Sequence, residues 1–222
     1  MPVQLRVILG LAVGLPVVGQ VGPQLPAAGM LSFAGFVFVT GEALVGLALG
    51  FAIQIGFAAA LVAGELIGGA MGLGFAAMVD PSSGSHSTAV GQLLNMFASA
   101  LFLCMDGHLA LIEIVVRSYG TLPPGAAWFG SRALQGLVEF GGLMFAAGLT
   151  LALPVAAALI FVQLVMGVVT RAAPALNLFA VGIPLTIIAG IALLAVATPV
   201  IATALEHQLQ TGVDEAARLA GG

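Results

Sequence analysis

The sequence predicts an all-α membrane protein of about five hydrophobic segments, whose long helices are broken by proline and glycine and form helical hairpins. First, 61% of the 222 residues are hydrophobic and 6% are charged, whereas a soluble domain carries about 25% charged residues. Second, the mean hydropathy is +1.20. Third, the 31 glycines and 11 prolines are typical of bilayer proteins with close helix contacts and kinks. These values exclude a soluble monomer and predict one compact membrane domain over residues 1–222.

The charged side chains and the potential metal ligands narrow the possible classes of protein further. Five arginines and nine acids give a net charge of −4, and no run of like charge is long enough to indicate nucleic-acid binding. Cys104 stands alone in an apolar run, so it can form no internal disulfide and is interpreted as a packing residue. His86 and His207 have no second ligand at metal spacing. We therefore expect no nucleic acid, no metal and no cofactor.

The expected helices follow the apolar stretches. In chain order they are Val3–Val21, Leu31–Ala63, Thr88–Val116, Ala133–Val169 and Leu176–Leu205. The first contains Arg6 and Pro16 and resembles a signal peptide only faintly, because no small-residue cleavage site follows, so it is expected to be a mature segment. Turn residues at Pro23–Gly29 precede the second segment, and a polar loop at Ser82–Ser87 precedes the third.

The last two segments follow the turn residues of Ser118–Gly130 and contain prolines. Pro154, Pro184 and Pro199 each remove a backbone donor, which should bend the helix or split it into a hairpin. Several segments are close to or longer than roughly 30 residues, or about 45 Å of helix, whereas the hydrocarbon core is about 30 Å thick. They are therefore not expected to be simple upright spans. Residues 206–222 follow as a short polar tail with amphipathic character.

One stretch, residues 64–81, interrupts the apolar sequence with glycine, glutamate and aspartate. Gly64, Gly68 and Gly72 recur at a spacing of four, which on a helix places them along one face and lets another backbone approach closely. Gly69 adds conformational freedom, so the stretch could equally leave helical geometry and form a packed, bent loop. The sequence leaves both structures open.

Met71, Phe75 and Met78 are spaced to share a helix face with these glycines. Methionine fills irregular gaps, so core packing is one interpretation. The other is that this flexible, apolar stretch closes a passage, because a seal must pack tightly when closed and still be able to move aside. The residues alone do not decide between the two.

Glu42, Glu65, Glu113 and Glu139 lie within or at the edge of apolar stretches, where carboxylates face protein, water or a partner rather than lipid. A proton relay is one hypothesis, and with it a small proton-coupled secondary transporter. No internal repeat supports the transporter, and no two acids share a motif. Helix capping or pairing with arginine is therefore favoured, and Glu113 with Arg117 at i and i+4 predicts an ordinary ion pair.

Two further polar groups are interpreted as turns. Asp106-Gly107-His108 places a histidine beside a carboxylate, which is the acid–base pairing that an intramembrane enzyme would use. Adjacent residues on a helix point apart and no nucleophile motif accompanies them, so a turn is favoured. Pro174 is expected to fix another turn, and Asn177 to cap the helix that follows.

Three blocks stand in order along nearly the whole chain. They are Gly64–Pro81 with Gly84; Leu101-Phe102-Leu103 with Gly107-His108, Ser118-Tyr119 and Leu122-Pro123; and Leu151–Pro154 through Arg171, Pro174, Asn177, Phe179, Gly182 and Pro184. Together they resemble the FliR family, the R-type subunit of the flagellar type III export gate, which is related to an injectisome subunit. The motif residues are Glu65, Asp80, Pro81, Gly107, His108, Pro154, Arg171, Pro174, Asn177, Gly182 and Pro184.

The resemblance implies a function. Members of this family assemble as a single copy with P-type and Q-type subunits into a helical, cone-shaped gate in the bacterial inner membrane, within the flagellar basal body. Unfolded flagellar proteins pass through this gate, and the A-type and B-type export proteins are further expected partners beside membrane lipid. The subunit itself would not be an enzyme, because ATP use and proton coupling would belong to other export proteins.

The resemblance also implies that residues 63–87 form a plug-like loop. The candidate residues for closing the pore are Gly68, Gly69, Met71, Gly72, Phe75 and Met78. Apolar side chains would exclude water from the closed pore, and the glycines would permit displacement by substrate. The chain departs from the family in two ways. One more hydrophobic segment usually precedes the element that here is Pro2 to Arg6, so the chain is expected to be N-terminally shortened, and Ala70 replaces a usual glutamine.

Overall fold

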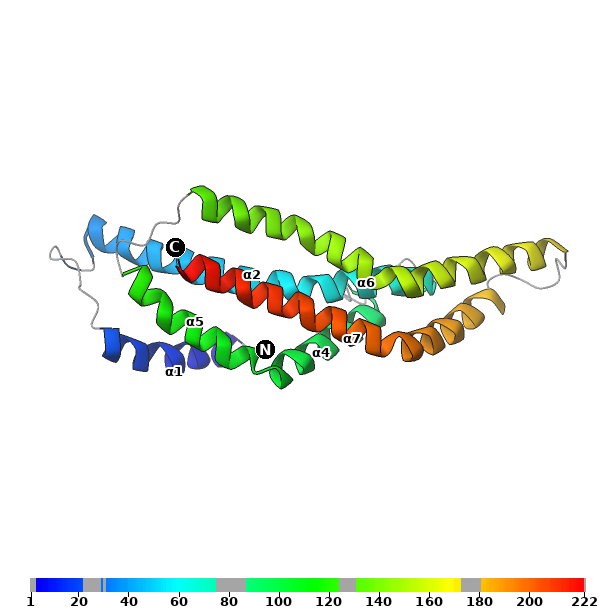
Figure 1. Ribbon diagram of the computed structural model, residues 1–222, viewed down its shortest axis with the longest axis horizontal. Helices are drawn as coiled ribbons and strands as arrows, with labels where there is room; N and C mark the ends of the chain where they lie inside the picture. Colours follow the sequence, from blue (N-terminus) through cyan, green and yellow to red (C-terminus); the bar gives the residue numbers. More distant parts are fainter. Residues whose placement is uncertain are drawn as a thin grey trace. The chain divides into compact units, whose positions relative to one another are not determined.

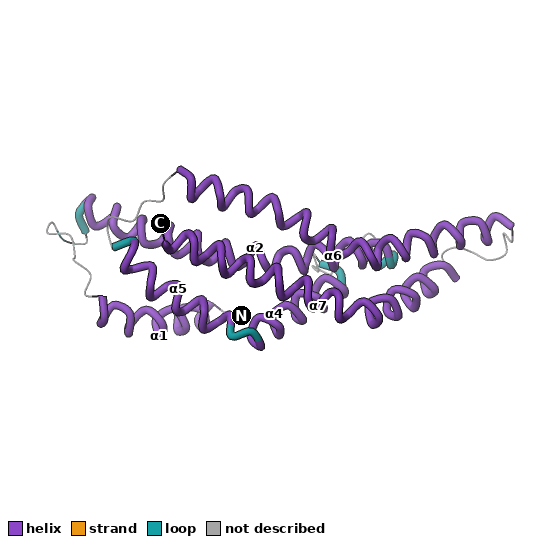
Figure 2. The backbone as a smooth tube through the Cα atoms, viewed as in Figure 1, coloured by secondary structure: helices purple, strands orange, loops and turns teal. Residues whose placement is uncertain are grey.

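The computed structural model describes residues 3–21, 29, 31–74, 87–123, 131–172 and 181–221. Within these ranges all regular structure is helical, as Figure 1 and Figure 2 show. The helices are α1 (Val3–Val21), α2 (Phe33–Ala70), α4 (Ala89–Cys104), α5 (Gly107–Thr121), α6 (Ser131–Ala172) and α7 (Ile183–Gly221). The first expected segment has the observed bounds, and residues 206–221, expected as a short tail, continue α7.

Several helices have the length and apolar character of membrane spans. Among the described residues, α2, α7 and the Gln135–Ala172 part of α6 could each cross a membrane, and α4 with α5 could together make a fourth span. Side chains such as Val196 and Phe161 are 80% and 67% exposed. These findings confirm the prediction of an all-α membrane protein.

The chain groups into two compact units, and the boundaries between them fall within α2, α6 and α7 and between α4 and α5. The first unit contains residues 1–53, 106–139 and 212–222, and the second contains residues 54–105 and 140–211. Within the first unit α1 contacts α5, and the Thr121 hydroxyl at the end of α5 donates a hydrogen bond to the Ala220 carbonyl of α7. Glu113 and Arg117 form the predicted ion pair, with 2.6 Å between Oε1 and the guanidinium.

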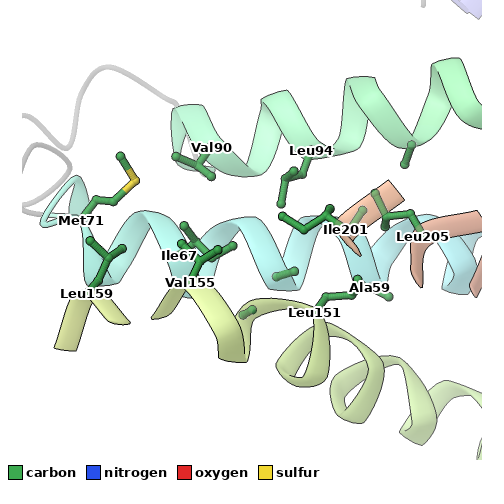
Figure 3. Close-up of a cluster of buried hydrophobic side chains, with 14 of the residues drawn as sticks. Ala59, Ile67, Met71, Val90, Leu94, Leu151, Val155, Leu159, Ile201 and Leu205 are labelled. Carbon is green, nitrogen blue, oxygen red and sulfur yellow. The ribbon is translucent and has the colours of Figure 1, made fainter. Parts of the chain in front are cut away.

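The second unit holds a hydrophobic core in which the second half of α2 packs against α4, α6 and α7. Figure 3 shows its side chains converging from these helices. The largest fully buried members are Ile67, Met71, Val155, Leu159 and Leu205. Truncating one such side chain to alanine costs about 2–5 kcal/mol in a close-packed interior. This core fixes the end of α2 against three neighbouring helices, which is where the candidate site lies.

The prolines do not split the helices in which they lie. Pro154 is inside α6 and Pro199 is inside α7, and both helices continue past them. One proline removes one backbone hydrogen bond, and in long apolar helices neighbouring helices and threonine side chains compensate for it. Pro184 lies in the first turn of α7, where the missing N–H would have no helical partner anyway.

A break occurs instead inside the segment expected at Thr88–Val116. The chain turns at Met105 and Asp106, and Asp106 adopts the left-handed conformation with φ of 56°. This finding agrees with the turn expected at Asp106-Gly107-His108. The left-handed region is open to aspartate at lower cost than to most residues, so Asp106 can end α4 and begin α5 without a proline.

Candidate functional site

The glycine-rich stretch begins as the last turns of α2 and ends that helix at Gly72. Gly72 has φ of +84°, which L residues rarely adopt. The Leu73 N–H donates to the Gly68 carbonyl and the Gly72 N–H to the Gly69 carbonyl, each at 3.0 Å. These two bonds form a Schellman motif, which satisfies carbonyls that a helix end leaves without partners. The backbone conformation therefore favours glycine at position 72.

Gly64 and Gly68 lie against the start of α4 and its N-cap residue. A Cβ atom at Gly64 would lie 2.4 Å from the Gly91 Cα, and one at Gly68 would lie 2.6 Å from the Thr88 Oγ1. Both separations are shorter than any real contact, so only glycine allows this approach. The expectation that the four-residue spacing admits a second backbone is confirmed for Gly64, whereas the atoms that approach Gly68 belong to the Thr88 side chain.

Glu65 holds the start of α4. Its Oε1 accepts a hydrogen bond of 2.7 Å from the Thr88 N–H, and Thr88 is the N-cap residue of α4. The Thr88 Oγ1 accepts from the Gly91 N–H at 3.0 Å and donates to the Gly64 carbonyl at 3.3 Å. A carboxylate at a helix N-terminus is also favoured by the helix dipole. The capping interpretation of this glutamate is confirmed.

Met71 belongs to the core, with 2% of its surface exposed. Its side chain lies against Gly190 of α7, where an added Cβ would come within 2.6 Å of the Met71 Cγ. Figure 3 shows Met71 at one end of the buried cluster, near Leu159. Of the two interpretations of this methionine, core packing is the one that the structure supports.

Two side chains from distant parts of the sequence hold the last carbonyls of α2. The Gln163 Nε2 of α6 donates to the Ala70 carbonyl at 2.6 Å. The buried Thr186 hydroxyl of α7 lies 2.9 Å from both the Met71 and the Ile183 carbonyls. Sequence analysis did not identify Gln163 or Thr186, because each lies in an apolar helix without any local motif. Nothing in the spacing of the residues indicates these partners.

The remaining predicted residues have separate environments. Gly107 is buried at the start of α5, whereas His108 beside it is exposed. Pro154, Arg171 and Pro184 are exposed on α6 and α7, and Gly182 is buried just before α7 begins. Among the described residues no three His, Cys, Asp or Glu side chains are placed to hold a metal ion. Phe75, Met78, Asp80, Pro81, Pro174 and Asn177 lie outside the described residues.

This arrangement is suited to fixing two helix ends in place rather than to carrying out a reaction. The end of α2 is bound by side chains of α6 and α7, and the start of α4 is bound to α2 through Glu65 and the Gly64 contact. Residues 75–86 connect these two fixed points in the sequence. The site is a frame that fixes the end of α2 and the start of α4, which this connection joins.

Comparisons with known proteins agree on one family. Residues 1–212 match the family described as bacterial export proteins, family 1. The chain is 41% identical to the flagellar biosynthetic protein FliR of Escherichia coli K12 over 204 residues, which is 91% of this chain and 77% of that protein. The same protein of Pectobacterium carotovorum is also 41% identical over 204 residues, with the same coverage of both chains. That of Caulobacter vibrioides is 33% identical over 87% of this chain and 77% of its own length.

Proposed function

The chain belongs to the FliR family of bacterial export proteins, and from this premise we propose that it is the structural and gating subunit of a flagellar protein export channel. It is a membrane component of the flagellar export apparatus, and the family consists of non-enzymatic subunits. In our proposal the chain lies in the bacterial inner membrane, in the flagellar basal body, and passes unfolded flagellar proteins.

The observation that carries the gating role is the frame around the glycine-rich stretch. A segment that closes a pore must keep its position relative to the pore while its middle moves aside. Its two ends should therefore be fixed, and its middle should not be part of a core. Gly68, Met71 and Gly72 lie at the end of α2, which is fixed. Glu65 fixes the start of α4. The glycine-rich stretch that begins here, with Phe75 and Met78, would then close the passage by packing apolar side chains and excluding water.

The proposal refines the roles of the six candidate residues. Gly68 and Gly72 act through the backbone geometry that they permit, and Met71 anchors the stretch in the core. Gly69 is exposed and has open space around it. We therefore assign the seal itself to residues beyond Leu73, and its base to the end of α2.

The partners follow from the family and from the surface. Export apparatus proteins are the expected partners of a family member, and we propose P-type and Q-type subunits as those in direct contact, with A-type and B-type proteins of the apparatus beyond them. Many large apolar side chains are exposed, among them Leu164, Val168 and Val200 at 61% or more. Such surface on so weakly charged a chain needs lipid or protein to cover it.

The test compares two aspartate substitutions one residue apart. Gly68→Asp places a charged side chain where a Cβ already overlaps Thr88, whereas Gly69→Asp places the same charge in open space. In cells that contain the partner subunits, we expect Gly68→Asp to change ion leakage and flagellar protein export, and Gly69→Asp to change both much less. Complex formation is measured in parallel by co-purification. Equal leakage and export in both variants, in normally assembled complexes, would show that the frame has no part in closure.

A further inference from the structure

The start of α4 carries half of a known N-terminal motif on its own sequence. In a capping box the N-cap side chain accepts from the N–H three residues on, and a glutamate at that third position reaches back to the N-cap N–H. The Thr88 Oγ1 makes the first of these bonds, to the Gly91 N–H. Gly91 has no side chain, so α4 cannot make the second bond itself.

Glu65 of α2 supplies the missing half. Its carboxylate accepts from the Thr88 N–H at 2.7 Å, which is the bond that the third residue of the motif would otherwise make. A Cβ at Gly91 would lie 2.5 Å from the Glu65 Oε1, so the carboxylate occupies the space of the absent side chain. The glycine that admits Gly64 at close range thus also admits the glutamate beside it.

This shared motif joins the two ends of the glycine-rich connection. Glu65 lies in the last two turns of α2, before the Schellman motif at Gly72, and Thr88 is the N-cap residue of α4. Two hydrogen bonds, from the Thr88 N–H to Glu65 and from the Thr88 hydroxyl to the Gly64 carbonyl, and the backbone contact of Gly64 with Gly91 therefore hold these ends together. The carbonyls at the end of α2 are held separately, by hydrogen bonds from Gln163 and Thr186.

We propose that Glu65 is a positioning residue, which completes the capping box of α4 from α2 and so sets the separation between the end of α2 and the start of α4. Only the effect expected on leakage rests on the proposed gating function. The role depends on the acceptor oxygen and the length of the side chain. Glutamine retains both, whereas aspartate is shorter by one carbon–carbon bond, about 1.5 Å, and leaves the Thr88 N–H out of reach.

The experiment measures end separation and closure in the same complex. Spin labels are placed at the exposed positions Leu66 and Gln92 of the full chain, after replacement of the exposed Cys104 by alanine, and the complex is purified with its export partners. Glu65→Asp breaks the bond from the α2 side, and Gly91→Ala displaces the carboxylate from the α4 side. Glu65→Gln is the matched control. Ion leakage is measured in cells with the same variants.

The expected result is a broadened label distance distribution for Glu65→Asp and Gly91→Ala, with a roughly tenfold rise in leakage, equal to about 1.4 kcal/mol of closure free energy. Glu65→Gln, which keeps the acceptor oxygen and loses only the charge, should stay much closer to the parent than Glu65→Asp in both measurements. A narrow, parent-like distribution for Glu65→Asp and Gly91→Ala would overturn the proposal, as would an equally broad one for Glu65→Gln. Broadening without any change in leakage would support the positioning role and would instead contradict closure by the glycine-rich stretch.

Discussion

Gly64→Ala should be the most damaging single methyl group that can be added to the glycine-rich stretch. The new Cβ would lie 2.4 Å from the Gly91 Cα, 2.8 Å from its nitrogen and 2.9 Å from the Val90 carbonyl oxygen. All three atoms belong to backbone, so no side-chain rotation relieves the overlap. The two helices must separate by about 1 Å to restore an ordinary contact, since packed atoms do not overlap.

The magnitude follows from three contributions. Overpacking of this kind costs about 1–3 kcal/mol, and separation of the helices breaks the Glu65 bond to Thr88, a bond to a charged group that contributes about 1.5–3 kcal/mol. The helix preference of alanine over glycine offsets about 1 kcal/mol. The net loss is about 1.5–5 kcal/mol, which for a chain of this size lowers the midpoint of thermal unfolding by roughly 3–20 °C.

Gly69→Ala is the matched control, because the same methyl group there meets nothing within 4 Å. It should leave the stability unchanged or raise it by up to about 1 kcal/mol. The assay is thermal unfolding of the detergent-solubilised complex, with flagellar protein export measured in cells. If Gly64→Ala proved as stable and as active as Gly69→Ala, the close approach of α2 and α4 would not exist in the assembled protein.

Two further pairs of variants test the end of α2 and the packing of α6 and α7 against α2. Gly72→Val should destabilise the complex by about 1–2 kcal/mol, because the left-handed conformation is costly for valine. Gly72→Asn should be close to neutral. Equal midpoints of thermal unfolding for the two variants would contradict the Schellman motif. Gly148→Ala should cost more than Gly190→Ala, since the first Cβ meets the branched Val62 at 2.6 Å and the second meets the flexible Met71 at 2.6 Å. Thermal unfolding measures the difference, and the reverse order would refute the packing described for α2.

Most of the structure that could be predicted followed from patterns of residues close together in the sequence. The spacing of Gly64 and Gly68 was interpretable because four residues make about one helical turn, whatever lies opposite. Glu113 and Arg117 were predictable for the same reason. The family resemblance, carried by three long blocks, gave the function that composition alone left open, and the comparisons with known proteins confirm it.

Contacts between distant segments could not be predicted in this way. Gln163 and Ala70 are 93 residues apart, and Thr186 and Met71 are 115 apart, so their bonds depend on how the helices pack. The partner of Glu65 was likewise unspecified, although its capping role was anticipated. Of the two effects expected of Pro154, a bend or a split, the split does not occur, because one lost hydrogen bond leaves the many others of a 42-residue helix in place.

The central claim is that this chain is a subunit of a flagellar export gate, and its direct test is the mass of the complex that it forms. The chain is co-expressed with the P-type and Q-type subunits of the same system, extracted in mild detergent and analysed by native mass spectrometry. We predict a single copy of the chain within one defined, larger assembly that contains both partners. A stable monomer or dimer that binds neither partner, when both are present in the same membranes, would contradict the claim.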